Sequence, residues 1–238
     1  MKNTILASFS DITVTYSSIH ALLNISCFIK RNSLLAISGP NGGGKSTFLK
    51  VATGILQPDK GSCSFNNINS YQDISYLPQI SCINDYVPVT VKDVVSCGLF
   101  VQKGFWKGLD SQDYYLVDLA LEKVGLIEFK QKLFHELSGG QRQRVLFARS
   151  IVQDSSLIFL DEPFAGVDSH TRDDLMQIIL EWNKKGHTIV AVLHDISLIQ
   201  EYFPDTIILC KSFIKQGRTS SVLTPDNMFN ARSALIAI

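Results

Sequence analysis

The sequence lacks an excess of charge of either sign, and it lacks any apolar run long enough to cross a bilayer. Its 238 residues include 22 Lys and Arg against 22 Asp and Glu, so the formal net charge is +0. This balance argues against a protein whose main activity is to coat nucleic acid or anionic lipid. No apolar stretch approaches the roughly 18 residues that a membrane-spanning helix needs. We therefore expect a soluble protein.

Cysteine and proline are also scarce. The five cysteines are odd in number, widely scattered, and form no CxxC pair, which argues against a disulfide framework or a zinc site and favours a reducing compartment. Only 7 prolines interrupt a chain that is 45% hydrophobic, so a disordered or low-complexity protein is excluded. Polar residues break every apolar run near the N-terminus. We therefore expect no secretory signal and a cytoplasmic location.

The hydrophobic pattern predicts one α/β domain that carries an inserted helical lobe. Short alternating runs up to about residue 37 are typical of antiparallel strands. Two later runs, residues 157–161 and 188–193, are continuously apolar, as are strands buried on both faces of a parallel sheet. The expected division is a core of about residues 1–80 and 154–238 with a helical subdomain of about residues 81–153.

Apolar residues at helical spacing predict four helices. One face carries Phe48, Val51, Ala52 and Ile55, a second carries Val117, Ala120, Leu121 and Val124, and a third carries Leu175, Ile178, Ile179 and Trp182. A fourth helix is expected around residues 145–152. Gly125 and Gly186 follow two of these segments and are typical of helix ends. The apolar run at residues 206–210 and a final hairpin-like segment around residues 216–217 are expected to complete the core.

The strongest local signal is GPNGGGKST at residues 39–47. It satisfies the pattern G-x-x-x-x-G-K-[ST] between a predicted buried strand and a predicted helix, which is the context that a phosphate-binding loop requires. Backbone N–H groups of such a loop converge on phosphate oxygens. Lys45 would reach the β- and γ-phosphates, and Ser46 would ligate Mg²⁺. The residues expected to bind ATP here are Gly39, Pro40, Asn41, Gly42, Gly43, Gly44, Lys45, Ser46 and Thr47.

The second signal is LIFLDEP, in which a buried strand ends on two carboxylates. Ligands of α/β proteins bind at the carboxyl ends of the strands. Asp161 is therefore expected to hold Mg²⁺, directly or through water. Glu162 is expected to orient and deprotonate the attacking water. The alternative is that both carboxylates only cap the following turn.

A phosphate-binding loop together with a carboxylate at a strand end is common to a large class of nucleotide hydrolases and kinases. The segment ELSGGQRQR, residues 136–144, points to one family within that class. It contains LSGGQ, and at this point the sequence resembles the ATP-binding cassette (ABC) ATPases. The resemblance covers about residues 5–210 and implies a RecA-like parallel core with an N-terminal antiparallel part. The other family elements follow in the family's order, namely Tyr16, Gln79 in SYLPQ, Asp168 in AGVD and His194 in VLHD.

The resemblance implies a role for each of these side chains. Tyr16 would stack on adenine, and the alternative is a core tyrosine in a strand. Gln79 would contact Mg²⁺ and the attacking water, and the alternative is a solvated loop residue. His194 would hydrogen-bond the γ-phosphate and the water, whereas a lone histidine after an apolar strand is more often structural. The other four histidines have no expected role.

LSGGQ presents a second helix N-terminus suited to phosphate, which one ATP held by the first loop does not need. The resemblance implies that the two half-sites come from two copies of the chain, with ATP between them in a head-to-tail dimer. Asp168 would lie at the interface between the two copies. The residues expected to contact the ATP of the other copy are Ser138, Gly139, Gly140 and Gln141.

Two further segments, residues 88–99 and 161–168, resemble the ATP-binding subunits of bacterial importers of zinc, manganese or iron. This resemblance implies a peripheral protein on the cytoplasmic face of the inner membrane, bound to separate permease subunits and served by an extracytoplasmic solute-binding protein. The lobe would accept a permease helix, with Phe100, Phe105 and Trp106 as candidates for that surface. Each could instead pack within the lobe.

Two alternatives to metal import stay open. One is an importer or exporter of another small solute, such as an iron chelate or haem. The other is a non-transport ABC ATPase, such as an assembly factor. A regulatory module without turnover would be expected to lack Glu162, Lys45 or His194, and all three are present.

Overall fold

The structure, a computed structural model, describes residues 4–68, 70, 73–79, 87–104 and 108–236. The strands are β1 (Ile5–Tyr16), β2 (Ile19–Lys30), β3 (Leu34–Ser38), β4 (Lys60–Phe65), β5 (Ile74–Leu77), β6 (Leu157–Asp161), β7 (Thr188–Val192), β8 (Asp205–Cys210) and β9 (Phe213–Arg218). The α-helices are α1 (Lys45–Ala52), α2 (Val91–Lys103), α3 (Ser111–Lys123), α4 (Gly139–Gln153), α5 (Ser169–Lys184), α6 (Ile196–Tyr202), α7 (Thr219–Val222) and α8 (Pro225–Ile236).

A six-stranded sheet forms the centre of the molecule, in the order β5-β6-β7-β3-β8-β9. Its strands pair in parallel except for β9, which is antiparallel to β8. Every residue of β3, β6 and β7 is buried, because helices cover strands of this kind on both faces. The predicted parallel core is confirmed. The final hairpin is also confirmed, although residues 216–217 lie within β9 rather than at the turn.

The N-terminal strands form a separate three-stranded antiparallel sheet in the order β2-β1-β4. The predicted antiparallel strands are confirmed, but β4 was not predicted, because its sequence KGSCSF is mostly polar and all six of its residues are exposed or half-buried. The expectation for Ile55 was wrong. Helix α1 ends at Ala52, and Ile55 lies beyond it with 61% of its surface exposed.

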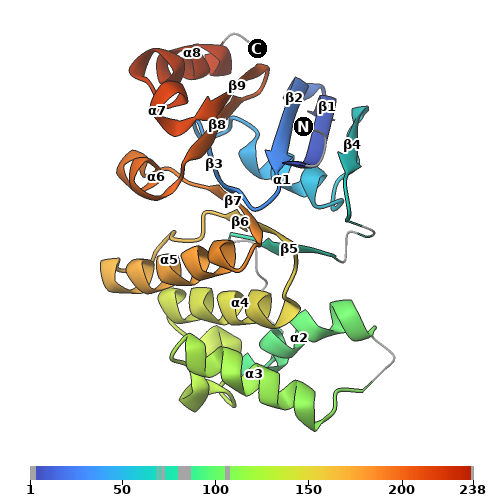
Figure 1. Ribbon diagram of the computed structural model, residues 1–238, viewed down its shortest axis with the longest axis vertical. Coiled ribbons are helices and arrows are strands. Elements are labelled where there is room, and N and C mark those ends of the chain that lie inside the picture. Colours follow the sequence, from blue (N-terminus) through green and yellow to red (C-terminus); the bar gives the residue numbers. More distant parts are fainter. Residues whose placement is uncertain (1–3, 69, 71–72, 80–86, 105–107, 237–238) are drawn as a thin grey trace.

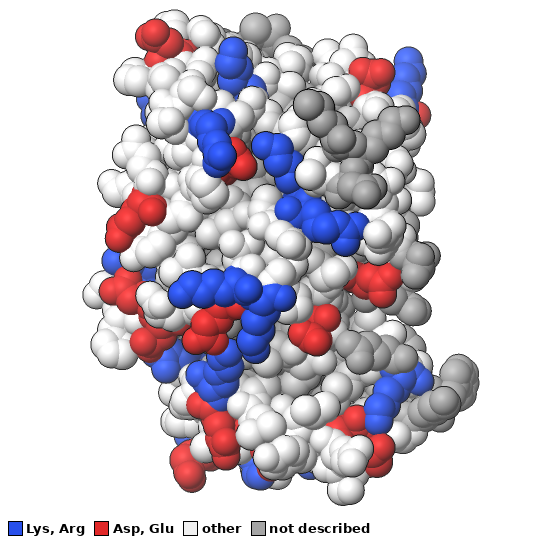
Figure 2. Space-filling view, viewed as in Figure 1, with Lys and Arg blue, Asp and Glu red and all other residues white. Residues whose placement is uncertain are grey.

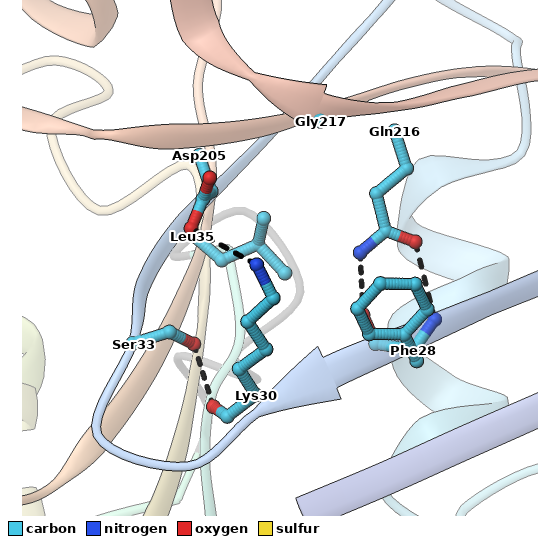
Figure 3. A pocket seen from close by; sticks show the side chains of 7 residues that line it. All are labelled: Phe28, Lys30, Ser33, Leu35, Asp205, Gln216 and Gly217. Atoms are coloured by element: carbon cyan, nitrogen blue, oxygen red, sulfur yellow. Dashed lines mark hydrogen bonds and ion pairs between the residues drawn. The ribbon is translucent and has the colours of Figure 1, made fainter. Parts of the chain in front are cut away.

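Polar contacts join the two sheets at the edge where β2 approaches β9 (Figure 3). Gln216 donates through Nε2 to the carbonyl oxygen of Phe28 at 2.6 Å and accepts from the Phe28 N–H at 3.2 Å. Lys30 and Asp205 form a longer ion pair at 4.0 Å. The cavity between these residues, about 50 Å³, is far too small for a nucleotide. These contacts therefore hold the two sheets together, and the cavity between them is not a nucleotide site.

Helices α2, α3 and α4 pack on one another below the central sheet (Figure 1). Helices α2 and α3 each begin with a capping box, at Thr90 and Asp110, which satisfies the free N–H groups of the first turn. Helix α4 starts at Gly139, six residues earlier than residues 145–152 suggested. The residue boundaries of the inserted lobe stay a prediction.

Charged side chains of both signs are interspersed on the face of the molecule seen in Figure 2. Among the described residues, none of the helices combines the length and the apolar character that spanning a bilayer requires.

Candidate functional site

The phosphate-binding loop connects β3, which ends at Ser38, to α1, which begins at Lys45. At two of its positions the backbone contacts neighbouring strands so closely that a side chain does not fit. A Cβ on Gly39, whose φ is 144°, would lie 2.2 Å from the carbonyl oxygen of Leu209, and one on Gly44 would lie 2.4 Å from that of Ala21. Glycine is therefore needed at both positions.

A cavity of about 330 Å³ opens above this loop. Its size suits a bound nucleotide. Tyr16, at the end of β1 and 47% exposed, contributes to its wall. The residues that line the cavity are Tyr16, Ala21, Asn41, Gly42, Gly43, Gly44, Lys45, Ser46, Thr47 and Glu162.

Lys45 is buried beneath the loop, with 6% of its surface exposed. Its Nζ donates to the carbonyl oxygens of Gly39 at 3.0 Å and Pro40 at 2.9 Å. Burial lowers the pKa of this ammonium group, and the nearby carboxylates of Glu162 and Asp161 oppose that shift. The cationic amine therefore lies at the floor of the cavity, where it can attract phosphate oxygens.

Asp161 ends β6 and is only 3% exposed. Ser46 donates through Oγ to Asp161 Oδ1 at 3.2 Å, and Tyr76 donates through Oη to Oδ2, also at 3.2 Å. Burial raises the pKa of this carboxyl, whereas the two hydrogen bonds act in the opposite direction. Hydroxyl and carboxylate oxygens are the ligands that Mg²⁺ prefers, so Ser46 and Asp161 fit a magnesium site. Sequence reasoning missed Tyr76, although it lies in the quoted segment SYLPQ.

Glu162 follows Asp161 at a sharp turn, where its φ is 50°, a left-handed conformation that is uncommon for residues other than glycine. Its Oε2 accepts a hydrogen bond from Gln79 Nε2 at 2.9 Å. Its Oε1 lies 2.8 Å from His194 Nε2. The structure thus brings together three residues that are far apart in the chain and that the sequence placed in one site.

The LSGGQ residues lie away from this cavity and are not among its lining residues. Ser138 caps α4: its Oγ accepts from the Gln141 N–H at 3.3 Å, and Gln141 Oε1 accepts from the Ser138 N–H at 3.0 Å. Ser138 and Gly139 are exposed. Within one chain, the N-terminus of α4 is therefore exposed and does not line the cavity above the glycine-rich loop.

Asp168 lies next to this segment, at the start of α5. A Cβ on Gly139 would be 3.8 Å from the carbonyl oxygen of Gly166, two residues before Asp168. The carboxylate of Asp168 caps α5 by accepting from the Thr171 N–H at 2.9 Å and from its hydroxyl at 2.8 Å. These hydrogen bonds hold the pKa of Asp168 below its usual value. The LSGGQ residues and Asp168 thus share one surface.

The structure describes one of the three candidates for the permease surface. Phe100, in α2, is half-buried. Phe105 and Trp106 lie outside the described residues.

Comparison with known proteins identifies the family. The family model described as ABC transporter matches residues 22–165. The manganese transport system ATP-binding protein MntA of Synechocystis sp. is 34% identical over 227 residues, which cover 93% of this chain and 87% of the relative. The corresponding protein MntB of Bacillus subtilis is 35% identical over 222 residues, covering 92% and 88%.

Solved structures agree with the fold. A chain of an ABC transporter described as of metal-chelate type, in an inward-facing conformation, superposes with a TM-score of 0.84 at 26% identity, covering 97% of this chain and 89% of that chain. CbiO1 from Clostridium perfringens, part of the transporter complex CbiONQ, superposes with a TM-score of 0.76 at 28% identity, covering 99% and 100%. These matches confirm the predicted fold class. Together with the family model, they show that the chain belongs to the ABC transporter family and is one of its ATP-hydrolysing cassettes.

Proposed function

We propose that this chain hydrolyses ATP to power the uptake of a metal ion through separate membrane permease subunits. Manganese is the first candidate for the transported ion, and zinc and iron are the alternatives. ATP hydrolysis is supported by the convergence of Gln79 and His194 on Glu162, beside the cavity above the phosphate-binding loop. The transported ion is supported by the relatives named for manganese transport, at 34% and 35% identity over more than nine-tenths of this chain.

In the proposed site, Asn41 to Thr47 line the cavity and bind the phosphates of ATP, and Tyr16 contacts the adenine from the cavity wall. Lys45 exchanges its bonds to the Gly39 and Pro40 carbonyl oxygens for bonds to phosphate. Ser46, Asp161 and Gln79 hold Mg²⁺, which when bound neutralises phosphate charge.

Glu162 is the proposed general base. Its carboxylate lies between an amide donor and an imidazole. A water that replaces either hydrogen bond can lose its proton to Oε1 or Oε2 as it attacks the γ-phosphate. His194, 42% exposed at its side chain, can then turn toward the γ-phosphate.

Two copies of the chain are needed to complete the site. Ser138, Gly139, Gly140 and Gln141 face away from the cavity of their own chain, and Ser138 and Gly139 are exposed. In a head-to-tail dimer, these residues of one copy close over the ATP bound by the other. Asp168, on the same surface, lies at the dimer interface.

The remaining partners are the integral membrane permease and, beyond it, an extracytoplasmic solute-binding protein. The chain would then be peripheral on the cytoplasmic face of the membrane, held there by the permease. Helices α2 to α4, with Phe100, are the proposed docking region, together with Phe105 and Trp106.

The test is purification of the tagged chain from native membranes, followed by identification of the proteins bound to it and assay of radioactive Mn²⁺ uptake by cells. A co-purifying multi-span permease, with uptake that is lost in Glu162→Gln cells, is the expected result. A tagged Glu162→Gln chain that still binds the permease serves as the matched control. Recovery of ribosomes or soluble assembly factors instead would contradict a transport role.

Uptake of a metal chelate is the second candidate, favoured by the structural similarity to a transporter described as of metal-chelate type. The same cells distinguish the two. Loss of chelated-iron uptake with intact Mn²⁺ uptake in the Glu162→Gln strain would favour the chelate.

A further inference from the structure

The side chain of Tyr76 extends from β5 of the core sheet to the carboxyl end of the neighbouring strand β6. It lies in β5, three residues before Gln79, and the strand register pairs it with Phe159 of β6. Its hydroxyl nevertheless donates to Asp161 Oδ2 at 3.2 Å. The side chain therefore runs two residues along the neighbouring strand, toward the carboxyl end where the nucleotide binds.

The contact completes the hydrogen bonding of a buried carboxylate. Asp161 is 3% exposed, and its other oxygen, Oδ1, accepts from Ser46 at 3.2 Å. With a donor on each oxygen, the plane of the carboxylate is fixed relative to Ser46. Groups that orient a metal ligand in this way strongly affect metal affinity.

The backbone of Tyr76 is itself held from the other side of the sheet. Arg149 of α4 donates through Nη2 to the Tyr76 carbonyl oxygen at 2.5 Å. On the same helix, Gln153 Nε2 donates to the Ile74 carbonyl oxygen at 3.1 Å, and the buried hydroxyls of Ser150 and Ser75 lie 3.3 Å apart. Helix α4 thus fastens β5, which limits where the Tyr76 hydroxyl can lie.

We propose that Tyr76 is a positioning residue that acts through Asp161 and sets the affinity of the ATP site for Mg²⁺. The proposal rests on the magnesium-dependent ATP site described above. A purely structural role would mean that the hydroxyl only satisfies a polar group at the edge of the core. In that case its removal would lower stability without changing the contribution of Mg²⁺ to nucleotide binding.

Tyr76→Phe removes the hydroxyl and keeps the ring, so it is the variant to test. The readout is the dissociation constant of a fluorescent ATP analogue, measured on the full chain in Mg²⁺ and again in EDTA. The expected result is an unchanged constant in EDTA and binding about tenfold weaker in Mg²⁺. Tyr115→Phe, on the exposed side of α3, is the matched control and should equal the wild type in both buffers.

The same measurement in an Asp161→Asn background tests whether the effect passes through Asp161. Adding Tyr76→Phe to Asp161→Asn should then change neither constant. A full effect of Tyr76→Phe in that background, or equal weakening in Mg²⁺ and EDTA, would overturn the proposal. Wild-type protein whose ATP affinity does not depend on Mg²⁺ would instead refute the magnesium site itself, and with it the proposed function.

Discussion

His194 and Glu162 lie 2.8 Å apart, between the imidazole Nε2 and one carboxylate oxygen, and the other oxygen of Glu162 accepts from Gln79. The pair joins the ends of two adjacent parallel strands, β6 and β7. Any water or γ-phosphate that enters this site competes for the same hydrogen-bonding groups. We therefore expect binding of ATP to be coupled to rearrangement of the three side chains.

The first prediction concerns Glu162→Gln. Loss of the proposed general base should reduce ATP hydrolysis by about 10²–10⁴-fold, while the phosphate-binding loop still binds ATP. ATP should therefore accumulate in a closed dimer, visible by size-exclusion chromatography. Wild-type protein with ADP serves as the control and should run as a monomer. A monomeric Glu162→Gln variant in ATP would count against the head-to-tail mechanism.

The second prediction concerns Ser138→Arg. Ser138 is exposed and lies outside the cavity of its own chain, so the variant should bind fluorescent ATP normally and lose turnover, measured as phosphate release. Because Ser138 also caps α4, Ser138→Ala should be compared by thermal unfolding to separate a lost cap from a blocked interface. Normal hydrolysis by Ser138→Arg would refute the role of this residue in the partner's site.

The third prediction concerns Gly39→Ala. The new Cβ would lie 2.2 Å from the Leu209 carbonyl oxygen, so the loop must shift or accept strain of about 1–3 kcal/mol. The variant should lose ATP affinity in equilibrium binding. Gly108→Ala is the matched control, since a Cβ there meets no atom of the described residues within 4 Å. Equal affinities of the two variants would mean that close backbone packing does not shape the loop.

The fourth prediction concerns pH and Asp168. Hydrogen bonds from Thr171 depress the pKa of this carboxyl in the folded state, so its contribution to stability is present above the unfolded pKa of about 3.9. It is lost as the pH falls through the folded pKa. Asp168→Ala should therefore lower Tm by about 2–4 °C at pH 7, and the difference from wild type should shrink on acidification.

Asp168→Asn separates charge from capping in that experiment. It retains an oxygen that can accept from the Thr171 N–H, so its Tm at pH 7 should lie closer to wild type than that of Asp168→Ala. A Tm difference between Asp168→Ala and wild type that stays constant down to pH 2 would show that ionisation of Asp168 does not contribute to stability.

The sequence alone determined the features that lie within short contiguous segments. The apolar patterns before and after residues 39–47 predicted the strand and the helix that flank this loop, and the motif itself predicted the loop. Helical spacing identified Leu175, Ile178, Ile179 and Trp182 as one buried face of α5. Such local patterns are readable because the period of a helix or strand directly selects which side chains face the core.

Only the tertiary structure decided what lies beside these segments. Strand β4 has a weak apolar pattern and exists because it pairs with β1. Ile55 continued the helical spacing but lies past the end of α1. Tyr76 contacts Asp161 across 85 residues of chain, and this contact depends on the pairing of β5 with β6. Strand register is set by packing of the whole sheet. The sequence pattern could therefore identify Asp161 as a candidate, but it could not identify the side chain that orients it.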